Sequence, residues 1–440
     1  MKRRVLGIEL ADGISAGNLW AYLFAAFISS AYAGALAVLQ PGLLQVMGIP
    51  FAEQGQLTGN LAAMQEVLFI LLLGVVGAVS DRVGRKAVYI FGLLTTGLGF
   101  VLYPFATSVP ELVAYRFIVA IGSAAMIGMM VTVIADYSTN KTRGKANGVQ
   151  GLVATFGAFI PPILGALPAR FVASGFTEAA AQQATFAVAA ALGVSAAVIG
   201  MIGLAPKATQ VMQSTRESMA KMLVEGAKAA KDTGVALSYG AAFISRGDLA
   251  VTGAFVGLWL VQHGMGVDGM TPSEAMANLV VPAVLVVVSG ALVGALLMGN
   301  LADRISRAAA IPIASGLAAA VYMSMYFVDD PTESWVKIVL FIMGIAEISA
   351  FVSSQALVGQ QAEPQRRGAV MGFFGVAGAF GILIGATGGG YVFGAIGPSS
   401  PFVIFGALNL VVFIWALLVY KRVKVPAWAE QAAADQEAAG

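Results

Sequence analysis

Two short polar segments of this chain repeat one another. The first reads Gly77-Ala78-Val79-Ser80-Asp81-Arg82-Val83-Gly84-Arg85-Lys86, and the second reads Gly299-Asn300-Leu301-Ala302-Asp303-Arg304-Ile305-Ser306-Arg307. Their aspartates lie 222 positions apart (303 − 81), about half the length of the 440-residue chain. Each segment ends one long apolar stretch and starts another. A duplicated, charged loop between apolar stretches predicts a membrane protein with two repeated halves.

The composition requires lipid as the solvent. The chain is 58% hydrophobic and 11% charged, with a mean hydropathy of +0.84. Soluble domains carry about 25% charged residues, so this chain is too poor in polar groups to cover itself with them. Cysteine is absent, which excludes disulfides, thiolate catalysis and cysteine-based metal sites.

The apolar stretches are long enough for helices that cross a bilayer, each of which needs about 20 residues. We predict twelve spans, over 18–46, 58–80, 87–106, 111–136, 147–173, 181–204, 236–263, 278–299, 309–328, 335–360, 369–396 and 400–420. The strands of a membrane β-barrel would alternate apolar and polar residues, which these stretches do not do. The sequence therefore predicts an all-α integral membrane protein.

Positive charges gather on one side of the predicted spans. Most of the 25 lysines and arginines fall at the N-terminus, in the long middle loop and in the loops on that same side. The opposite loops hold Arg170 and Lys337 among several carboxylates. By the positive-inside rule, both termini and the middle loop face the cytoplasm, and we expect a multi-pass protein of the cell (inner) membrane.

The longest connection separates the predicted halves. We expect four regions: an N-terminal six-helix bundle over 1–206, a cytoplasmic linker over 207–235, a C-terminal six-helix bundle over 236–425 and a disordered cytoplasmic tail over 426–440. In the linker, Met212, Met219 and Met222 recur at helical spacing among lysines, which predicts an amphipathic helix on the inner leaflet. A solvated linker helix is the alternative.

The repeat extends beyond the two loops. Gln40-Pro41-Gly42 aligns with Gln262-His263-Gly264 at the same offset (262 − 40 = 222), and Arg143-Gly144 aligns with Arg367-Gly368 at 224 (367 − 143). With these markers in order, the chain resembles the major facilitator superfamily over essentially its whole length. Residues 77–86 are similar to that family's loop between helices 2 and 3, and 299–307 to its loop between helices 8 and 9. The resemblance implies twelve helices in two pseudo-symmetric six-helix bundles around a central cavity.

The resemblance also implies a role for the loop charges. In the family, the aspartate and arginines of this loop form a cluster that latches the two halves on the cytoplasmic side. The residues that inherit this gate role are Asp81, Arg82, Arg85, Asp303 and Arg304, with Asp136 as a further partner. A carboxylate stabilises a helix N-terminus, and a charge pair can break when the halves move. Simple anchoring of the loop at the lipid headgroups is the alternative.

Five ionisable residues lie at bilayer depth, away from the ends of the predicted spans: Glu66, Arg116, Arg246, Asp248 and Glu347. An ionisable group at bilayer depth costs at least about 2.5 kcal/mol on insertion scales, so each is a functional candidate. At about 1.5 Å per helical residue, four of them lie roughly 22–25 Å from the cytoplasmic boundary, and Arg116 lies about 30 Å from it. Four charges therefore share one level near the bilayer centre.

The partners of these charges decide what they do. Arg246 and Asp248 are two residues apart on one helix, so they face different sides and each needs a separate partner. In the superfamily, helices 1, 4, 7 and 10 line the cavity, which implies that Arg246, Asp248 and Glu347 meet in the C-terminal half. We expect Arg246 to pair with Glu347, leaving Asp248 or Glu66 to exchange a proton, because a desolvated carboxylate binds a proton more readily. A static network between helices is the alternative.

These charges favour a secondary active transporter that works by alternating access. We expect proton coupling and a small anionic or carboxylate-bearing metabolite, attracted by Arg246 and Arg116. Gln40, Gln262 and Gln355 offer hydrogen bonds to such a substrate, with helix packing as the alternative. A proton-driven exporter of multidrug or amphipathic compounds is the close alternative, since three intramembrane acids outnumber two bases. A non-transporting membrane sensor is a minor one.

Other classes lack support in the sequence. With one histidine and no cysteine or clustered metal-ligand spacing, we expect no enzyme, metal or cofactor. The phosphate-binding pattern GxxxxGK[ST] does not occur, so ATP-driven transport is not indicated. The expected partners are a small-molecule substrate, protons and the lipid bilayer, with no nucleic acid. Twelve spans suffice for one carrier, so we expect a monomer.

Overall fold

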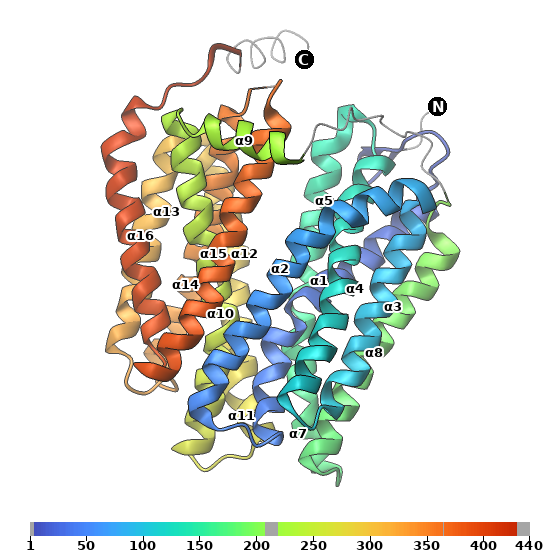
Figure 1. Ribbon diagram of the computed structural model, residues 1–440, viewed down its shortest axis with the longest axis vertical. Helices are drawn as coiled ribbons and strands as arrows, with labels where there is room; N and C mark the ends of the chain where they lie inside the picture. Colours follow the sequence, from blue (N-terminus) through green and yellow to red (C-terminus); the bar gives the residue numbers. More distant parts are fainter. Residues whose placement is uncertain (1–3, 207–218, 364, 429–440) are drawn as a thin grey trace. The chain divides into compact units, whose positions relative to one another are not determined.

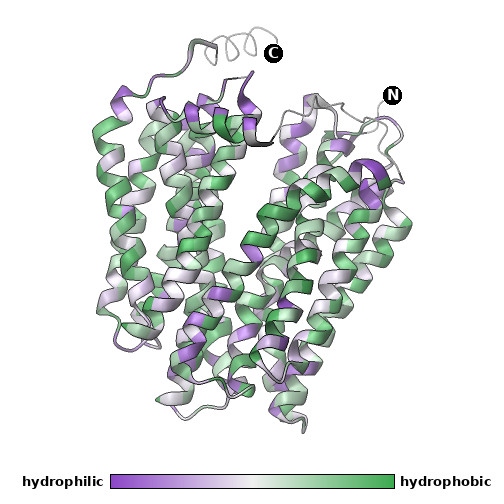
Figure 2. Ribbon diagram, viewed as in Figure 1, coloured by the Kyte–Doolittle hydropathy of each residue, from purple (hydrophilic) through white to green (hydrophobic). Residues whose placement is uncertain are grey.

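The structure, a computed structural model, describes residues 4–206, 219–363 and 365–428, with the side chains of 140, 219, 220 and 303 also outside the description. In this part of the chain, twelve helical segments are long and apolar enough to cross a membrane. Figure 1 shows these long helices, and Figure 2 shows hydrophobic residues along most of their length. The predicted all-α membrane protein with twelve spans is confirmed.

Internal contacts group the chain into two compact units. The first comprises the described residues of 1–51, 64–214 and 257–285, and the second those of 52–63, 215–256 and 286–440. Three long helices, α2 (Phe51–Val83), α10 (Thr233–Gly266) and α12 (Val281–Arg304), therefore contribute to both units. The bundle boundaries drawn from the sequence stay a prediction.

The first unit holds most of the N-terminal helices. Its further elements are β1 (Arg4–Val5), β2 (Ile8–Glu9), α1 (Ala16–Val46), α3 (Arg85–Leu102), η1 (Tyr103–Phe105), α4 (Val109–Tyr137), η2 (Asn140–Thr142), α5 (Arg143–Gly157), α6 (Ile160–Gly165), α7 (Leu167–Ala173), α8 (Glu178–Gly203), α11 (Pro272–Ala275) and the π-helical turn η3 (Met276–Val280). Helices α3 and α4 approach closely, because a Cβ atom at Gly92 would collide with the Met126 backbone. Small residues permit such contacts in bilayers.

Two features of this unit escape the sequence prediction. A short hairpin, β1 and β2, precedes α1, and the hairpin and the residues after it bond to the end of α4 and the loop that follows: Ala11 N–H donates to Tyr137 O at 3.0 Å, and Thr139 N–H donates to Glu9 O at 3.0 Å. The predicted span 147–173 is three helices, with Pro161 and Pro162 in the first turn of α6. Proline is accepted there because the first-turn N–H groups have no partner within the helix.

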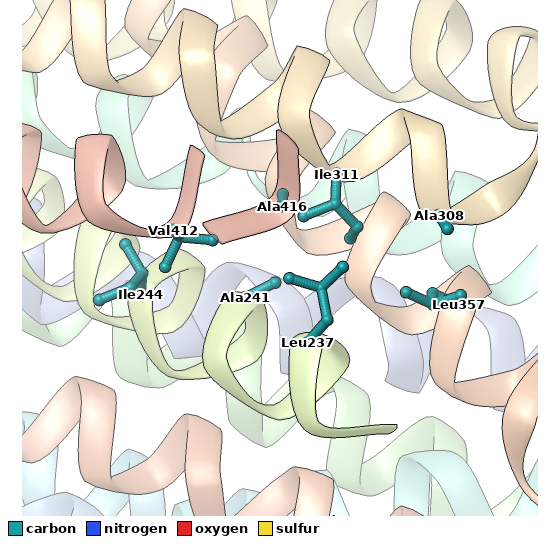
Figure 3. Close-up of a cluster of buried hydrophobic side chains, with 8 residues drawn as sticks. All are labelled: Leu237, Ala241, Ile244, Ala308, Ile311, Leu357, Val412 and Ala416. Carbon is teal, nitrogen blue, oxygen red and sulfur yellow. The ribbon is translucent and has the colours of Figure 1, made fainter. Parts of the chain in front are cut away.

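The second unit holds most of the C-terminal helices. Besides parts of α2, α10 and α12, it contains α9 (Met219–Ala229), α13 (Arg307–Ser324), η4 (Met325–Phe327), α14 (Ser334–Gln361), α15 (Arg367–Ala395), α16 (Ser400–Val419) and η5 (Tyr420–Arg422). Its core includes the apolar cluster of Figure 3, where side chains of α10, α13, α14 and α16 meet. In the same unit, Gly381 of α15 lies against the backbone of Phe243 on α10.

The linker helix α9 packs on transmembrane helices of the second unit. The Tyr239 hydroxyl on α10 donates to Gly226 O of α9 at 3.0 Å and to Val370 O of α15 at 3.2 Å. These bonds tie α9 to the bundle, so it is neither an isolated linker helix nor held by lipid alone. Residues 207–218 of the predicted linker, Met212 among them, and residues 429–440 of the predicted tail lie outside the described part of the chain.

Candidate functional site

Asp248 is fully buried in the second unit, midway along α10. In the part of the chain that the structure describes, its hydrogen-bond partner is Asn409 of α16, whose Nδ2 lies 2.9 Å from Oδ1 and 3.0 Å from Oδ2. The same Nδ2 donates to the carbonyl oxygen of Phe405 at 3.0 Å. Because a carboxylate and a carbonyl both accept hydrogen bonds, only the NH2 end of Asn409 fits between them.

Glu347 is 3% exposed and lies midway along α14. Its Oε1 accepts a hydrogen bond of 2.6 Å from the hydroxyl of Tyr322 on α13. That hydroxyl in turn lies 2.7 Å from Oγ1 of Thr252 on α10, which is 3.5 Å from the sulfur of Met343. Four polar or polarisable side chains therefore form one buried chain between three helices.

Arg246 takes a different partner from the one predicted. Its guanidinium lies 4.5 Å from the ring centroid of Phe351, a cation–π contact, instead of pairing with Glu347. Phe351 lies one helical turn after Glu347 on α14, and the carboxylate of Glu347 accepts a hydrogen bond from Tyr322. The prediction that Arg246 and Asp248 face different sides agrees with their contacts.

A small cavity lies beside Asn409 in the second unit. Its volume of about 10 Å³ suits one water molecule. Its lining combines hydroxyl groups with apolar side chains of the Figure 3 cluster: Ser315, Ser353, Ala241, Ile244, Ile311 and Val412. Both serine hydroxyls already donate to backbone oxygens of their own helices, so they offer oxygen lone pairs to the cavity.

The first unit carries a buried cation where the second carries acids. Arg116 of α4 is 8% exposed, and its Nη1 donates to Gln40 Oε1 of α1 at 3.3 Å. The Tyr103 hydroxyl donates to the same oxygen at 2.8 Å. Among the described residues, Arg116 has no carboxylate partner, and its Nε has no hydrogen-bond partner. A buried guanidinium held only by neutral groups suits an anion supplied by a ligand.

A further buried amide lies in the same unit. Gln182 of α8 is 1% exposed, and both polar atoms of its amide lack a partner among the described residues. It lies one turn before Phe186, whose ring packs 5.8 Å from that of Tyr103. Unsatisfied buried polar atoms are rare in proteins, which makes this amide a candidate for ligand binding.

The repeated loop forms a compact charge cluster in the first unit. Arg85 Nη1 lies 2.6 Å from Asp81 Oδ1, and Arg85 Nε lies 3.1 Å from Asp136 Oδ2. Arg85 also donates to the hydroxyl of Ser80. Between α2 and α3, Gly84 has φ +97°, a conformation that side chains disfavour, so glycine permits the turn that brings these groups together.

The remaining predicted residues are placed as follows. Glu66 is half-buried on α2, and the Gln262 amide donates to Phe51 O at 3.1 Å. Gln355 is exposed on α14. Arg82 and Arg304 are exposed, and the side chain of Asp303 lies outside the described residues. The gate role of these charges stays a prediction.

Sequence reasoning missed the buried neutral side chains that lie around the charges or offer an unsatisfied amide to a ligand: Tyr103, Gln182, Thr252, Tyr322 and Asn409. Of these residues, only Asn409 had a feature in the sequence that could have identified it. Asparagine is costly within a span as apolar as 400–422, whose most apolar 18-residue window has a mean hydropathy of 2.7. The tyrosines and Thr252 carry no such signal, because each is compatible with an apolar helix.

In the described part of the chain, twelve apolar helices that bury both cations and carboxylates define a polytopic membrane protein with charges inside its helix bundles. The family model of the Major Facilitator Superfamily matches residues 22–348 and 239–438, and the chain belongs to that superfamily. A crystal structure of a bacterial homologue of the human lysosomal transporter Spinster, inward-facing and unoccupied, matches with a TM-score of 0.72 at 18% identity, covering 93% of this chain and 98% of that one. This likeness shows the shared fold.

Two magnetosome proteins are similar to most of the chain, and a multidrug resistance protein is similar to about a fifth of it. The magnetosome protein MamH of Paramagnetospirillum magneticum is 24% identical over 88% of this chain and 89% of its own. MamZ of Magnetospirillum gryphiswaldense is 24% identical over 90% of this chain, which spans only 61% of MamZ. Multidrug resistance protein 3 of Bacillus subtilis is 34% identical over 91 residues, or 21% of this chain.

Proposed function

We propose that this chain is a proton-coupled secondary active transporter of a small carboxylate-bearing metabolite. It works by alternating access in the cell (inner) membrane as a monomer, with both termini in the cytoplasm. The charge cluster of Asp81, Arg85 and Asp136 serves as its cytoplasmic gate. The observation that carries the proposal is a pair of carboxylates, Asp248 and Glu347, buried at the centres of two membrane helices with neutral partners.

The cost of these carboxylates supports proton coupling. A carboxylate buried without a cation costs several kcal/mol in desolvation, and amide or hydroxyl donors offset only part of it. Binding a proton removes the charge and the cost. A buried carboxylate of the second unit therefore stores free energy that a proton can release, which is what a proton-driven conformational change needs.

The substrate class follows from the cations. Arg116 has neutral partners and an Nε–H available for a bond, and a carboxylate is the group that a guanidinium binds best. Arg246 is half-buried and already held over Phe351, so it contributes attraction at longer range. We therefore assign Arg116 as the main anion-binding residue, with Gln40 and Tyr103 holding its orientation.

A proton-driven exporter of amphipathic compounds is the second candidate. It is favoured by the local similarity to multidrug resistance protein 3, which is confined to about a fifth of the chain. In that case Glu66 rather than Arg116 recognises the compound, since a cation needs a carboxylate. The two candidates differ in the charge of the ligand.

Proton flux in proteoliposomes tests the proposal. Purified protein is given a panel of organic carboxylates and lipophilic cations, and internal pH is followed with a trapped dye. We expect a carboxylate to drive proton flux that is lost in Arg116→Ala and kept in Glu66→Gln. Flux driven by a lipophilic cation and lost in Glu66→Gln would establish the exporter. Ligand uptake without any proton movement would refute the coupling.

A further inference from the structure

The two buried acids of the second unit have unlike partners. Asp248 faces the NH2 group of Asn409, whose orientation the Phe405 carbonyl fixes. Of the two hydrogens on that nitrogen, one serves the carbonyl and the other is shared by the two carboxylate oxygens. Such a partner donates but cannot accept, so it serves both oxygens of an ionised Asp248, whereas the O–H group of a protonated Asp248 finds no acceptor in it.

Glu347 instead faces groups that can both donate and accept. The hydroxyl of Tyr322 donates to Oε1 as the structure stands, and Thr252 then donates to the oxygen of Tyr322. The direction of these hydrogen bonds can reverse when Glu347 binds a proton. A protonated Glu347 donates to the Tyr322 oxygen, Tyr322 donates to Thr252, and Thr252 donates to the sulfur of Met343, which lies 3.5 Å away. Every hydroxyl keeps a partner in both states.

From this asymmetry we infer that Glu347 is the group that binds and releases the proton, that Tyr322 is a hydrogen-bond switch for it, and that Asn409 holds Asp248 as a fixed charge. This inference deepens the proposed proton coupling and rests on it. It revises the prediction from the sequence, which assigned proton exchange to Asp248 or Glu66. Tyr322 acts as a positioning residue, since it turns its O–H group without losing it.

The chemical step is a simple proton transfer. A hydronium ion gives its proton to Glu347, so that an O–H bond forms on the carboxylate and water is left behind. On release, the same O–H bond breaks and water takes the proton. Tyr322, Thr252 and Met343 reorient their hydrogen bonds, and none of them changes its number of protons.

The charged groups around Glu347 favour this division of roles. Asp248 comes from α10, Tyr322 from α13 and Asn409, which is neutral, from α16. Arg246 lies over Phe351, one turn along α14, and its stem packs near Gly378 of α15. If Asp248 keeps its charge, a second charge on Glu347 is repelled by it, so proton binding at Glu347 relieves that repulsion.

Infrared titration of the purified protein tests the inference without any substrate. The carbonyl stretch of a protonated carboxyl group is followed from low to high pH. We expect a buried carboxyl band that titrates in the wild type and in Asp248→Asn, and that is missing in Glu347→Gln. A band that persists in Glu347→Gln, or no titrating band at all, would overturn the assignment.

The switch is tested by removing one hydroxyl. Tyr322→Phe keeps the ring but removes the donor to ionised Glu347, so the band should titrate about one pH unit higher. Tyr89→Phe is the matched control, because Tyr89 is also fully buried and loses only its bond with Ser29, and we expect the wild-type midpoint. An unshifted midpoint in Tyr322→Phe would refute the switch.

A second pair of variants tests the same switch in case Tyr322→Phe does not fold. Thr252→Val removes the second hydroxyl and should shift the midpoint, whereas Thr252→Ser keeps the hydroxyl and should not. An equal midpoint in both variants would count against the chain of hydroxyls. If the carboxyl band titrates as expected but no proton flux occurs in proteoliposomes, the proposed proton coupling is refuted and the assignment of Glu347 is not. The failure of the inference can therefore be distinguished from the failure of the proposed function.

Discussion

The two compact units place a tyrosine in similar surroundings beside charges of opposite sign. In the first unit, Tyr103 follows α3, stacks near Phe186 and donates to Gln40, which also binds Arg116 of α4. In the second unit, Tyr322 lies near the end of α13, has Phe402 at 6.4 Å and donates to Glu347 of α14. The third helix of each half thus supplies a tyrosine, and the fourth supplies the charge.

Under the proposed function, this difference gives the two units different tasks. Both units place a buried tyrosine beside a charge, but the tyrosines lie 219 positions apart (322 − 103) and the charges 231 (347 − 116), so neither pair occupies aligned positions of the 222-residue repeat. A guanidinium with neutral partners suits an anion, and a carboxylate with neutral partners suits a proton. We therefore assign anion recognition to the first unit and proton binding to the second.

Removal of the buried cation Arg116 should give the largest change, a loss of affinity for the transported carboxylate. In Arg116→Ala, the affinity for the transported carboxylate should fall about 100-fold, because a charge-assisted bond to a buried guanidinium is worth about 3 kcal/mol. Binding is measured by scintillation proximity on the purified protein. Arg116→Lys is the control and should lose less, since it keeps the charge but not the forked geometry. Unchanged affinity in Arg116→Ala would remove the first unit from anion recognition.

Disruption of the close packing between α10 and α15 should give the next largest effect, a loss of stability. A Cβ atom at Gly381 would collide with the carbonyl oxygen of Phe243, which cannot turn away as a side chain would. Gly381→Ala should therefore lower stability by about 2 kcal/mol in a thermal unfolding assay in detergent. Gly388→Ala, on the same helix with open space around it, is the control and should be neutral or slightly stabilising. Equal melting temperatures would contradict this packing.

An internal counter-ion should make the first unit less able to bind a ligand anion. In Gln40→Glu, the new carboxylate lies beside Arg116, so the affinity for the carboxylate ligand should drop about tenfold, or about 1.4 kcal/mol. Gln262→Glu, at the aligned position of the repeat, carries the same change beside no arginine of this cluster and serves as control. Equal loss in both variants would indicate a general effect of added charge.

The charge cluster of the repeated loop should have the smallest effect on stability. Arg85→Ala removes contacts with Asp81 and Asp136, but these side chains are partly exposed and screened by solvent. We expect a loss below about 1 kcal/mol in the same unfolding assay. A transport rate that falls much more than stability would support the gate role, and a proportional fall of both would favour loop anchoring.

The fold could be predicted from the sequence because the patterns that indicate it extend over long segments of the chain. Twelve apolar stretches and a loop repeated at an offset of 222 (303 − 81) predict the helices and the family. The short hairpin before α1 and the breaks near Pro161 were missed, since two-residue strands and helix interruptions leave little periodic pattern.

The site was only partly predictable. Intramembrane charges stand out from an apolar background, so Arg116, Asp248 and Glu347 were identified from the sequence. Their partners depend on which helix faces which, and on the turn of the helix that each side chain reaches. Charge attraction alone predicted a pair of Arg246 with Glu347, whereas the structure gives Glu347 the hydroxyl of Tyr322.

The division of work between the two units is tested most directly by comparing two transport modes in Glu347→Gln. Exchange of labelled for unlabelled carboxylate at equal pH requires binding and movement but no net proton release, whereas uptake driven by a pH gradient requires both. We predict that Glu347→Gln keeps exchange and loses gradient-driven uptake at least about 100-fold, while Arg116→Ala loses both. Gradient-driven uptake that survives in Glu347→Gln, or exchange that survives in Arg116→Ala, would contradict the account.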